Sequence, residues 1–304
     1  ISKPKFMISQ HSFLIGCAMG ELSKIHNIPA IAISHSTHTS HKSEDIFYEC
    51  RILADTMMNK IFPYIAVQNP QMLQFLQDNN YQSEQMINTG PLLYNKNLHK
   101  EKNVKNLKKN IFGEYSNKKI ILHAGTPKIR GSSRLIIYET VDEYIKNINN
   151  IISVIREKKD IFLAIRYRDS PHIPLKDFKE LVKESENCKI YHEGNFKDFL
   201  AVSDIMISYS STTIDEALYN KVPVILYDSD NKYSHIQASK INKNMEKLTD
   251  GVFYCSELNE LNFTIDKVLN EREILSVVAF TFTSTLCSNH EGNNISSLVT
   301  EGKN

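Results

Sequence analysis

The sequence predicts an α/β fold made of two domains, each built around a parallel sheet. Short apolar, β-branched runs bounded by turn residues alternate with longer stretches of helical period, which is the pattern of βαβ units. The length of 304 residues suits two domains, at roughly 100–200 residues per domain. The loop Asn88-Thr-Gly-Pro91 interrupts the alternation, because Gly90 permits unusual backbone angles and Pro91 cannot continue a helix. We expect the domain boundary there.

The first domain, residues 1–94, is expected to contain three strands and three helices. Short apolar runs predict strands over Phe6–Ser9, Ala30–Ser34 and Tyr64–Gln68. Apolar residues at helical spacing predict helices over Phe13–His26, Asp45–Asn59 and Gln71–Asn79. Strands and helices alternate, so neighbouring strands are expected to run parallel.

Residues 95–118 are expected to form a linker helix on the surface. The stretch is rich in Lys and Asn, but apolar residues recur near helical spacing at Leu98, Val104, Leu107 and Ile111. Gly113 suits the end of such a helix. A nucleic-acid-binding patch is the alternative interpretation of the lysines.

The second domain, residues 119–275, is expected to be a complete doubly wound sheet. Its strands are predicted over Ile120–His123, Ile161–Arg166, Lys189–Tyr191, Ile205–Ser208 and Val222–Tyr227. Its helices are predicted over Val141–Arg156, Leu175–Ser185, Phe196–Val202 and Ile214–Tyr219. Two more helical stretches follow, one from Leu258 and one around Ile295–Val299, and residues 276–304 are expected to form a helical tail.

Charge, hydropathy and cysteine content exclude several classes of protein. The 36 basic and 35 acidic residues leave a net charge of +1, which gives no broad field to attract nucleic acid or an anionic membrane. The longest apolar stretches fall short of the ~18–20 residues that span a bilayer. The five cysteines lie far apart without a C-x-x-C pair, which suits reduced thiols in a cytosol. We expect a cytoplasmic protein without a metal, cofactor or nucleic-acid partner.

Four consecutive hydroxyl residues follow the predicted strand over 205–208: Ser210, Ser211, Thr212 and Thr213. A helix is expected to begin there, so free backbone N–H groups and hydroxyls converge at its positive end and favour a phosphate or pyrophosphate. Glu216 lies one turn later, where its carboxylate is placed to accept hydrogen bonds from ribose hydroxyls. The alternative is a capping box, with Thr213 as the cap and Glu216 reaching back to it.

This segment resembles the C-terminal nucleotide-binding domain of GT-B glycosyltransferases, and within them the CDP-glycerol glycerophosphotransferase and capsular polysaccharide transferase group. The likeness is carried by Ser203-Asp-Ile-Met-Ile-Ser-Tyr-Ser-Ser211 before the helix and Asn220-Lys-Val-Pro-Val-Ile225 after it. Weaker likenesses lie in Lys119-Ile-Ile-Leu-His-Ala-Gly-Thr-Pro127 and Ile87-Asn-Thr-Gly-Pro91. The resemblance implies two Rossmann-like domains of GT-B type.

A full first domain of that type usually has more than three strands. The N-terminal domain is therefore expected to be incomplete, with Ile1 an internal start. The fragment is expected to keep the donor site and part of the acceptor site, and it need not be active by itself.

The loop from Gly125 to Arg134 is the second candidate for donor binding. Glycine lets the backbone of Gly125 approach a ligand, and Thr126, Arg130 and Arg134 are suited to phosphate oxygens. A solvated surface loop is the alternative.

Arg166 and Arg168 end another strand at the same edge of the predicted sheet. The resembled group carries a His-Pro pair near this point, and the chain has Arg166-Tyr-Arg-Asp169 instead. The two guanidinium groups are candidates to replace the charge of that histidine.

Three histidines follow the predicted strand over Ala30–Ser34: His35, His38 and His41. The resemblance places His35-Ser36 where the group has a His-Gly pair that faces the acceptor. This makes His35 the candidate general base and His38 the second choice, because an imidazole takes a proton near neutral pH. A zinc site from the H-x-x-H-x-x-H spacing and a polar surface loop are the alternatives.

Two further motifs have alternative explanations. Asp228-Ser-Asp230 fits the D-x-D metal pattern of the other large glycosyltransferase fold, although three-letter acidic matches are common. His192-Glu-Gly-Asn195 follows a strand where GT-B domains often place a loop beside the nucleotide base, but a tight turn explains it as well.

The resemblance implies a transferase. It would move a sugar or polyol-phosphate from a nucleotide-activated donor to a hydroxyl of a surface polysaccharide or teichoic-acid-like acceptor, either a glycan or lipid-linked. Peripheral association with the inner face of the cell membrane would fit such an acceptor. The alternatives are a non-hydrolysing nucleotide-sugar 2-epimerase and a non-catalytic nucleotide- or glycan-binding relative.

Overall fold

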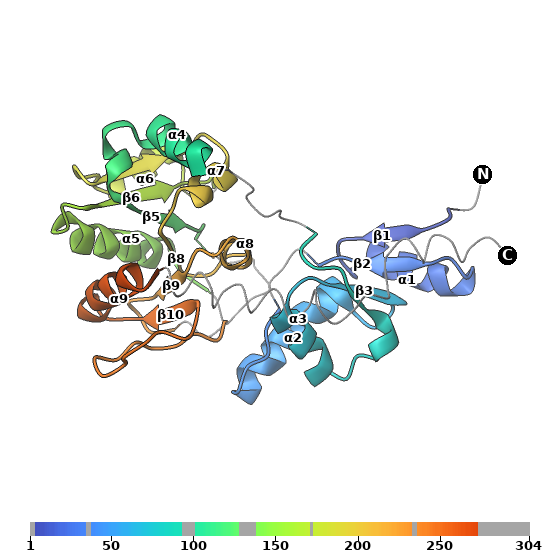
Figure 1. The fold of residues 1–304 in the computed structure, drawn as a ribbon. Helices are drawn as coiled ribbons and strands as arrows, with labels where there is room; N and C mark the ends of the chain where they lie inside the picture. The colour runs from blue at the N-terminus through green and yellow to red at the C-terminus, as the bar shows by residue number, and fades with distance from the viewer. Residues whose placement is uncertain are drawn as a thin grey trace. The chain divides into compact units, whose positions relative to one another are not determined.

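The computed structural model describes residues 4–34, 38–92, 101–127, 138–170, 173–232 and 236–272 (Figure 1). These residues form two compact units: unit 1 holds the described residues up to Leu92, and unit 2 holds those from Glu101 onward. Both units are α/β with parallel sheets, which confirms the predicted fold class.

Unit 1 contains a four-stranded parallel sheet in the order β1-β2-β3-β4. The strands are β1 (Met7–Ser9), β2 (Ala30–Ala32), β3 (Tyr64–Val67) and β4 (Met86–Asn88). Its helices are α1 (Ile15–Ile25), α2 (Glu44–Met58), α3 (Pro70–Asp78) and the short 3-10 helix η1 (Ser83–Gln85). Asn69 begins α3, because its side chain accepts a hydrogen bond from Met72 N at 2.7 Å and Pro70 fits the first helical position.

The prediction of three strands in this part of the chain is wrong, since β4 pairs with β3 through Ile65 and Met86. The sequence pattern predicts no strand over Met86–Asn88 and begins the boundary loop at Asn88. A three-residue strand with only one buried side chain, Ile87, has too little apolar pattern to be recognised.

Unit 2 contains a six-stranded parallel sheet in the order β10-β9-β8-β5-β6-β7. The strands are β5 (Lys119–Ala124), β6 (Ile161–Arg166), β7 (Cys188–Tyr191), β8 (Ile205–Ser208), β9 (Val224–Tyr227) and β10 (Val252–Cys255). The helices are α4 (Glu101–Phe112), η2 (Gly113–Asn117), α5 (Val141–Arg156), α6 (Leu175–Leu181), α7 (Phe196–Ala201), α8 (Thr213–Tyr219) and α9 (Leu258–Asn270).

Strand β10 was not predicted, and β9 is the last strand of this sheet that the sequence indicates. Strand β10 follows a long irregular connection, and it pairs with β9 through Val252 and Val224. The doubly wound order itself agrees with the prediction, because three strands lie on each side of the point between β5 and β8.

Alternating side chains of this sheet form two hydrophobic layers. Ile121 and its neighbours pack under α5, α6 and α9, whereas Leu122 and its neighbours pack under α4, α7 and α8. The predicted surface helix α4 therefore has a buried side: Phe112 is in the core of unit 2, and Val104 packs against it. Gly113, with φ at +57°, ends the helix as the sequence predicts.

Candidate functional site

The carboxyl ends of β5 and β8 lie side by side at the centre of the unit 2 sheet. The chain continues from β5 to β6 on one side and from β8 to β9 on the other, and ligands of doubly wound sheets bind at such a reversal. The two following loops are close, since a Cβ atom on Gly125 would lie 3.7 Å from Ser208 Oγ. The structure thus brings Gly125 and Thr126 next to the hydroxyl residues after β8.

The start of α8 does not form the capping box that the sequence left as an alternative. Thr212 is the N-cap residue of α8, and its side chain makes no capping hydrogen bond. With the N-cap at Thr212, the third helical position is Asp215 and not Glu216. Ser211 Oγ instead accepts a hydrogen bond from Thr213 N at 3.3 Å. A capping box between Thr213 and Glu216 would require the helix to begin at Ile214, one residue later than it does. Glu216 therefore does not cap α8.

Three polar atoms near the start of α8 are buried without a hydrogen-bond partner: Ser210 Oγ, Thr213 Oγ1 and Glu216 Oε1. An unsatisfied buried polar group costs about 1–3 kcal/mol, so such groups are rare unless a ligand or water meets them. Helix α8 has seven residues, and its dipole adds little. The side chains of Ser210, Thr213 and Glu216 are therefore the groups at this point that a ligand would satisfy.

Burial also affects the charge of Glu216. Desolvation raises the pKa of its carboxyl above the ordinary value, and Lys197 partly opposes the rise. The group combines hydroxyl donors for phosphate oxygens with a carboxylate acceptor for ligand hydroxyls. A nucleotide diphosphate offers both kinds of partner.

Of the two arginine candidates that the structure describes, Arg166 is engaged elsewhere. Arg166 donates from Nη1 to the carbonyls of Tyr167 (2.7 Å) and Tyr191 (3.1 Å), and from Nη2 to the carbonyl of Gly194 (2.8 Å). Its guanidinium is therefore occupied in holding the loop after β7, and burial lowers its pKa. Arg168 is exposed. Arg130 and Arg134 lie outside the described residues.

The turn over 192–195 is held by its own backbone geometry. Gly194 has φ at +91°, which a side chain rarely adopts, and Asn195 caps α7 by accepting from Lys197 N at 3.1 Å. These contacts explain the motif as a tight turn before α7.

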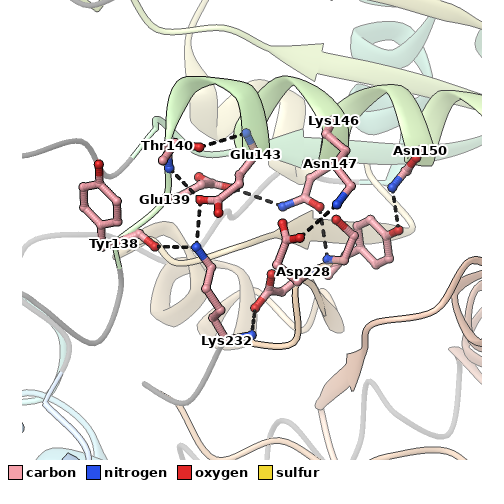
Figure 2. Close-up of polar contacts among 12 residues, drawn as sticks. Tyr138, Glu139, Thr140, Glu143, Lys146, Asn147, Asn150, Asp228 and Lys232 are labelled. Carbon is pink, nitrogen blue, oxygen red and sulfur yellow. Dashed lines mark hydrogen bonds and ion pairs between the residues drawn. The ribbon is translucent and has the colours of Figure 1, made fainter.

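The Asp228-Ser-Asp230 motif builds a loop in the structure (Figure 2). The carboxylate of Asp228 accepts from the backbone N–H groups of Asp230 (3.1 Å) and Lys232 (2.5 Å). The Asp230 carboxylate pairs with Lys146 Nζ at 2.9 Å. Both carboxylates thus have protein partners, which is not the arrangement of an open metal site.

Helix α5 anchors the other side of this loop, as Figure 2 shows. Lys232 Nζ pairs with Glu143 at 2.7 Å, and Asn147 Oδ1 accepts from Ser229 N at 3.1 Å. Asn147 Nδ2 donates to Glu139 at 3.2 Å. This polar network was not predicted, and its signal in the sequence is Asn147, an amide among the buried apolar residues of α5.

The histidine loop of unit 1 is described only in part. His35, the first candidate base, lies outside the described residues. His38 is buried, and its Nε2 lies 2.6 Å from Ser34 Oγ. This contact holds the His38 ring in its loop, and the role of His38 as second-choice base stays a prediction. His41 Nδ1 accepts from Ser43 N at 3.0 Å, and burial lowers its pKa.

Within the described part of the chain, no group of three or more His, Cys, Asp or Glu side chains could hold a metal ion. No helix described in the structure has the length and hydropathy needed to cross a membrane.

Residues 22–300 match the family of CDP-Glycerol:Poly(glycerophosphate) glycerophosphotransferases. The chain belongs to this family. The resemblance inferred from Ser203–Tyr227 is therefore confirmed, and the chain is a transferase of the class that uses nucleotide-activated donors. No curated protein matches the chain significantly.

Solved structures support the same fold. The wall teichoic acid polymerase TagF, in a variant soaked with CDPG, aligns with 98% of this chain and 72% of its own at 15% identity and a TM-score of 0.54. The S. aureus MnaA–UDP co-structure aligns with 91% of this chain and 68% of its own at 12% identity and a TM-score of 0.56. UDP-GlcNAc 2-epimerase from Neisseria meningitidis aligns with 91% of this chain and 70% of its own at 13% identity and a TM-score of 0.51. At these identities the likeness concerns the GT-B fold alone.

Proposed function

We propose that the chain transfers glycerol phosphate, or a closely related polyol phosphate, from a CDP-activated donor to a hydroxyl of a poly(glycerophosphate)-like acceptor. Family membership supports the class of donor and acceptor. The observation that carries the proposal is the group of partnerless buried atoms on Ser210, Thr213 and Glu216 at the switch point. The acceptor would be a glycan or lipid-linked chain, met at the inner face of the cell membrane.

The donor would be held mainly by unit 2. Ser210 and Thr213 would donate hydrogen bonds to phosphate oxygens, and Glu216 would accept from the ribose hydroxyls. The backbone at Gly125 and the hydroxyl of Thr126 line the same edge. We also propose that Arg130 and Arg134 neutralise phosphate charge, while Arg166 stays with the loop after β7.

The proposed reaction is a phosphoryl transfer that balances without a further reactant. The acceptor oxygen forms a bond to the phosphorus that carries glycerol, and the bond from that phosphorus to CMP breaks. CMP leaves with the electron pair, and His35 takes the acceptor proton, a role worth roughly 10²–10⁴ in rate. Hydrogen-bond donors at Ser210 and Thr213 would stabilise the negative charge that develops on CMP.

A panel of donors tests the proposal directly. The protein would be incubated with CDP-glycerol or UDP-GlcNAc, with and without a poly(glycerol phosphate) primer. We expect CMP release from CDP-glycerol that depends on the primer. Conversion of UDP-GlcNAc to its 2-epimer would instead support the epimerase alternative, for which the structural likeness gives only a fold. Tight binding of CDP without turnover by the complete protein would indicate a non-catalytic relative.

The nucleotide site can be tested by itself through the affinity for CDP. Glu216→Gln should raise the Kd about tenfold, because a hydrogen bond to a charged group contributes about 1.5–3 kcal/mol. Glu186→Gln is the matched control, since Glu186 is exposed between α6 and β7. Equal Kd values for the Glu216 variant and the parent protein would remove Glu216 from the donor site.

A further inference from the structure

Two buried tyrosines tie the loops after β5 and β8 to the start of α5. The hydroxyl of Tyr144, a residue of α5, donates a hydrogen bond to the Gly125 carbonyl at 3.2 Å. The Tyr209 hydroxyl donates to the carbonyl of Tyr138, which lies just before α5, at 3.3 Å. Tyr144 and Tyr209 are only 3% and 7% exposed. The proposed donor site gives neither tyrosine a role.

Both contacts lie directly beyond the end of the sheet. Strand β5 makes its last ladder pair at Ala124, and Gly125 is the next residue. Strand β8 makes its last ladder pair at Ser208, and Tyr209 is the next residue. The backbone leaves the ladder at these positions and needs other contacts to keep one conformation. The tyrosine hydroxyls therefore hold the first loop residue of each of the two central strands.

The start of α5 is a firm anchor for these contacts. Thr140 and Glu143 form a capping box, in which Glu143 N donates to Thr140 Oγ1 at 3.1 Å and Thr140 N donates to Glu143 Oε2 at 2.8 Å. The helix that follows has seven buried residues, and Tyr144 is one of them. Burial raises the pKa of Tyr144 and of Tyr209, so both hydroxyls remain protonated donors near neutral pH.

The Tyr144 contact sets the direction of one peptide group at the proposed donor site. In a trans peptide the carbonyl and the following N–H point in opposite directions, and no described peptide bond is cis. Because the Gly125 carbonyl is turned to Tyr144, the N–H of Thr126 points away from it. An N–H group held in one direction can meet a phosphate oxygen without rearrangement. Tyr209 in turn holds the chain directly before Ser210.

We propose that Tyr144 and Tyr209 are positioning residues of the transferase, whose hydroxyls hold the loops after β5 and β8 in the arrangement that binds the donor diphosphate. This inference rests on the proposed function, because the diphosphate is the ligand proposed there. The tyrosines act through Thr126 and Ser210 rather than by contact with the donor. Loss of either hydroxyl weakens donor binding and leaves the chemistry of transfer unchanged.

Hydrogen exchange tests whether each tyrosine holds its own loop. Tyr144→Phe keeps the ring, and it should speed exchange about threefold in residues 122–127, since one hydrogen bond to the backbone is lost. Tyr209→Phe should do the same in residues 206–213. Tyr167→Phe is the matched control, because Tyr167 is 1% exposed and its hydroxyl also bonds to a carbonyl, in the loop after β6. The control should change exchange in neither segment.

Donor kinetics give a readout that a merely structural role would not change. In Tyr144→Phe and in Tyr209→Phe, the Kd for CDP and the KM for CDP-glycerol should each rise about threefold to fivefold, with kcat unchanged. Tyr167→Phe should lower the melting temperature Tm and leave Kd and KM at the parent values. The same rise of KM in all three variants would overturn the proposal.

The failure of this inference can be distinguished from the failure of the proposed function. If the parent protein and both donor-loop variants bind CDP equally well, the donor site stands and the positioning role is wrong. If the parent protein neither binds CDP nor uses CDP-glycerol, the proposed function is wrong and the positioning role fails with it. Unchanged exchange in both loops would overturn the positioning role whatever the affinity for CDP.

Discussion

The carboxyl edges of the two sheets satisfy their polar groups in different ways. In unit 1, Ser34 and His38 bond to each other at 2.6 Å, and Gln68 joins the Ser34 carbonyl (2.5 Å) to Leu92 N (3.2 Å). In unit 2, polar atoms at the ends of β5 and β8 and at the start of α8 have no protein partner: His123 Nδ1, Ser208 Oγ, Ser210 Oγ, Thr213 Oγ1 and Glu216 Oε1. One atom of unit 1 at a strand end, Asn88 Oδ1, is also partnerless.

The strand order explains the difference. Strands β1 to β4 follow the order of the chain, so no reversal occurs between the described strands of unit 1. Unit 2 reverses between β5 and β8, which opens a position where a ligand can reach both loops. Polar residues that bond to each other stabilise a loop, whereas partnerless ones cost stability and are typical of ligand sites. The following experiments test this distinction.

Truncation of the unit 1 pair should have the largest effect, and only on stability. His38→Ala leaves a space beside Phe75, whose ring centre lies 5.9 Å from that of His38, and removes a partner of Ser34. We expect the free energy of unfolding of unit 1 to fall by about 3 kcal/mol. Denaturant unfolding measures this change, and the affinity for CDP should stay the same. A stable variant with weakened CDP binding would contradict the comparison.

Acid should destabilise unit 2 through His123. The pKa of His123 is about 4 in the folded state and about 6.5 in the unfolded state, so the unfolded state binds a proton first as the pH falls. Stability is unaffected above about pH 7 and falls between pH 6.5 and 4, by about 3 kcal/mol in total. Unfolding measured at several pH values should show this fall in the parent protein and a smaller one in His123→Phe. Parallel curves would show that His123 does not titrate in this way.

Replacing Thr213 should stabilise unit 2 and at the same time weaken the binding of CDP. Thr213→Val keeps the shape and removes a buried hydroxyl without a partner, so unit 2 should gain up to about 1 kcal/mol while the Kd for CDP rises about fivefold. Thr264→Val is the matched control, because the Thr264 hydroxyl is buried and bonds to the Cys255 thiol. The Thr264→Val variant should be less stable than the parent protein and should bind CDP with the same affinity. Calorimetry and titration with CDP measure both quantities, and a Thr213 variant that loses stability would argue against a ligand site.

The elements that the sequence predicts best are those with a long or fully buried apolar pattern. Helix α5 (Val141–Arg156) and strands β6 and β8 have the predicted bounds, because seven buried residues define the helix and both strands are almost wholly buried. Strand β4 was missed because only one of its side chains is buried, and strand β10 was missed although three of its four residues are buried, because it follows a long irregular connection after β9.

The sequence predicted the run of hydroxyl residues from Ser210 to Thr213 and its position directly after strand β8. The register of α8 was not predicted, because one αR residue at Thr212 decides whether Glu216 caps the helix or stays without a partner. Tertiary contacts also decided the roles of Arg166 and His123. A histidine within the apolar run Ile120–Ala124 is indistinguishable from a core residue in the sequence, and only the strand order places it at the switch point.

The smallest effect expected is a pH dependence of nucleotide affinity that originates from Glu216. Burial raises the pKa of its carboxyl in the free protein, and accepting hydrogen bonds from ribose would stabilise the ionised form and lower that pKa. The affinity for CDP should therefore be constant at neutral pH and weaken as the pH falls through the raised pKa, which lies above 4.5, by less than tenfold per pH unit.

The terminal phosphate of CDP also titrates, near pH 6, so the parent protein by itself does not isolate the carboxyl. With the Glu216→Gln variant, the phosphate of CDP still titrates, but no carboxyl titrates at position 216. The ratio of the two Kd values should thus shrink as the pH falls, because a protonated Glu216 resembles glutamine in charge. A constant ratio from pH 7 to 4.5 would mean that Glu216 remains ionised or does not meet the nucleotide, and the partnerless carboxylate of unit 2 would then need another ligand.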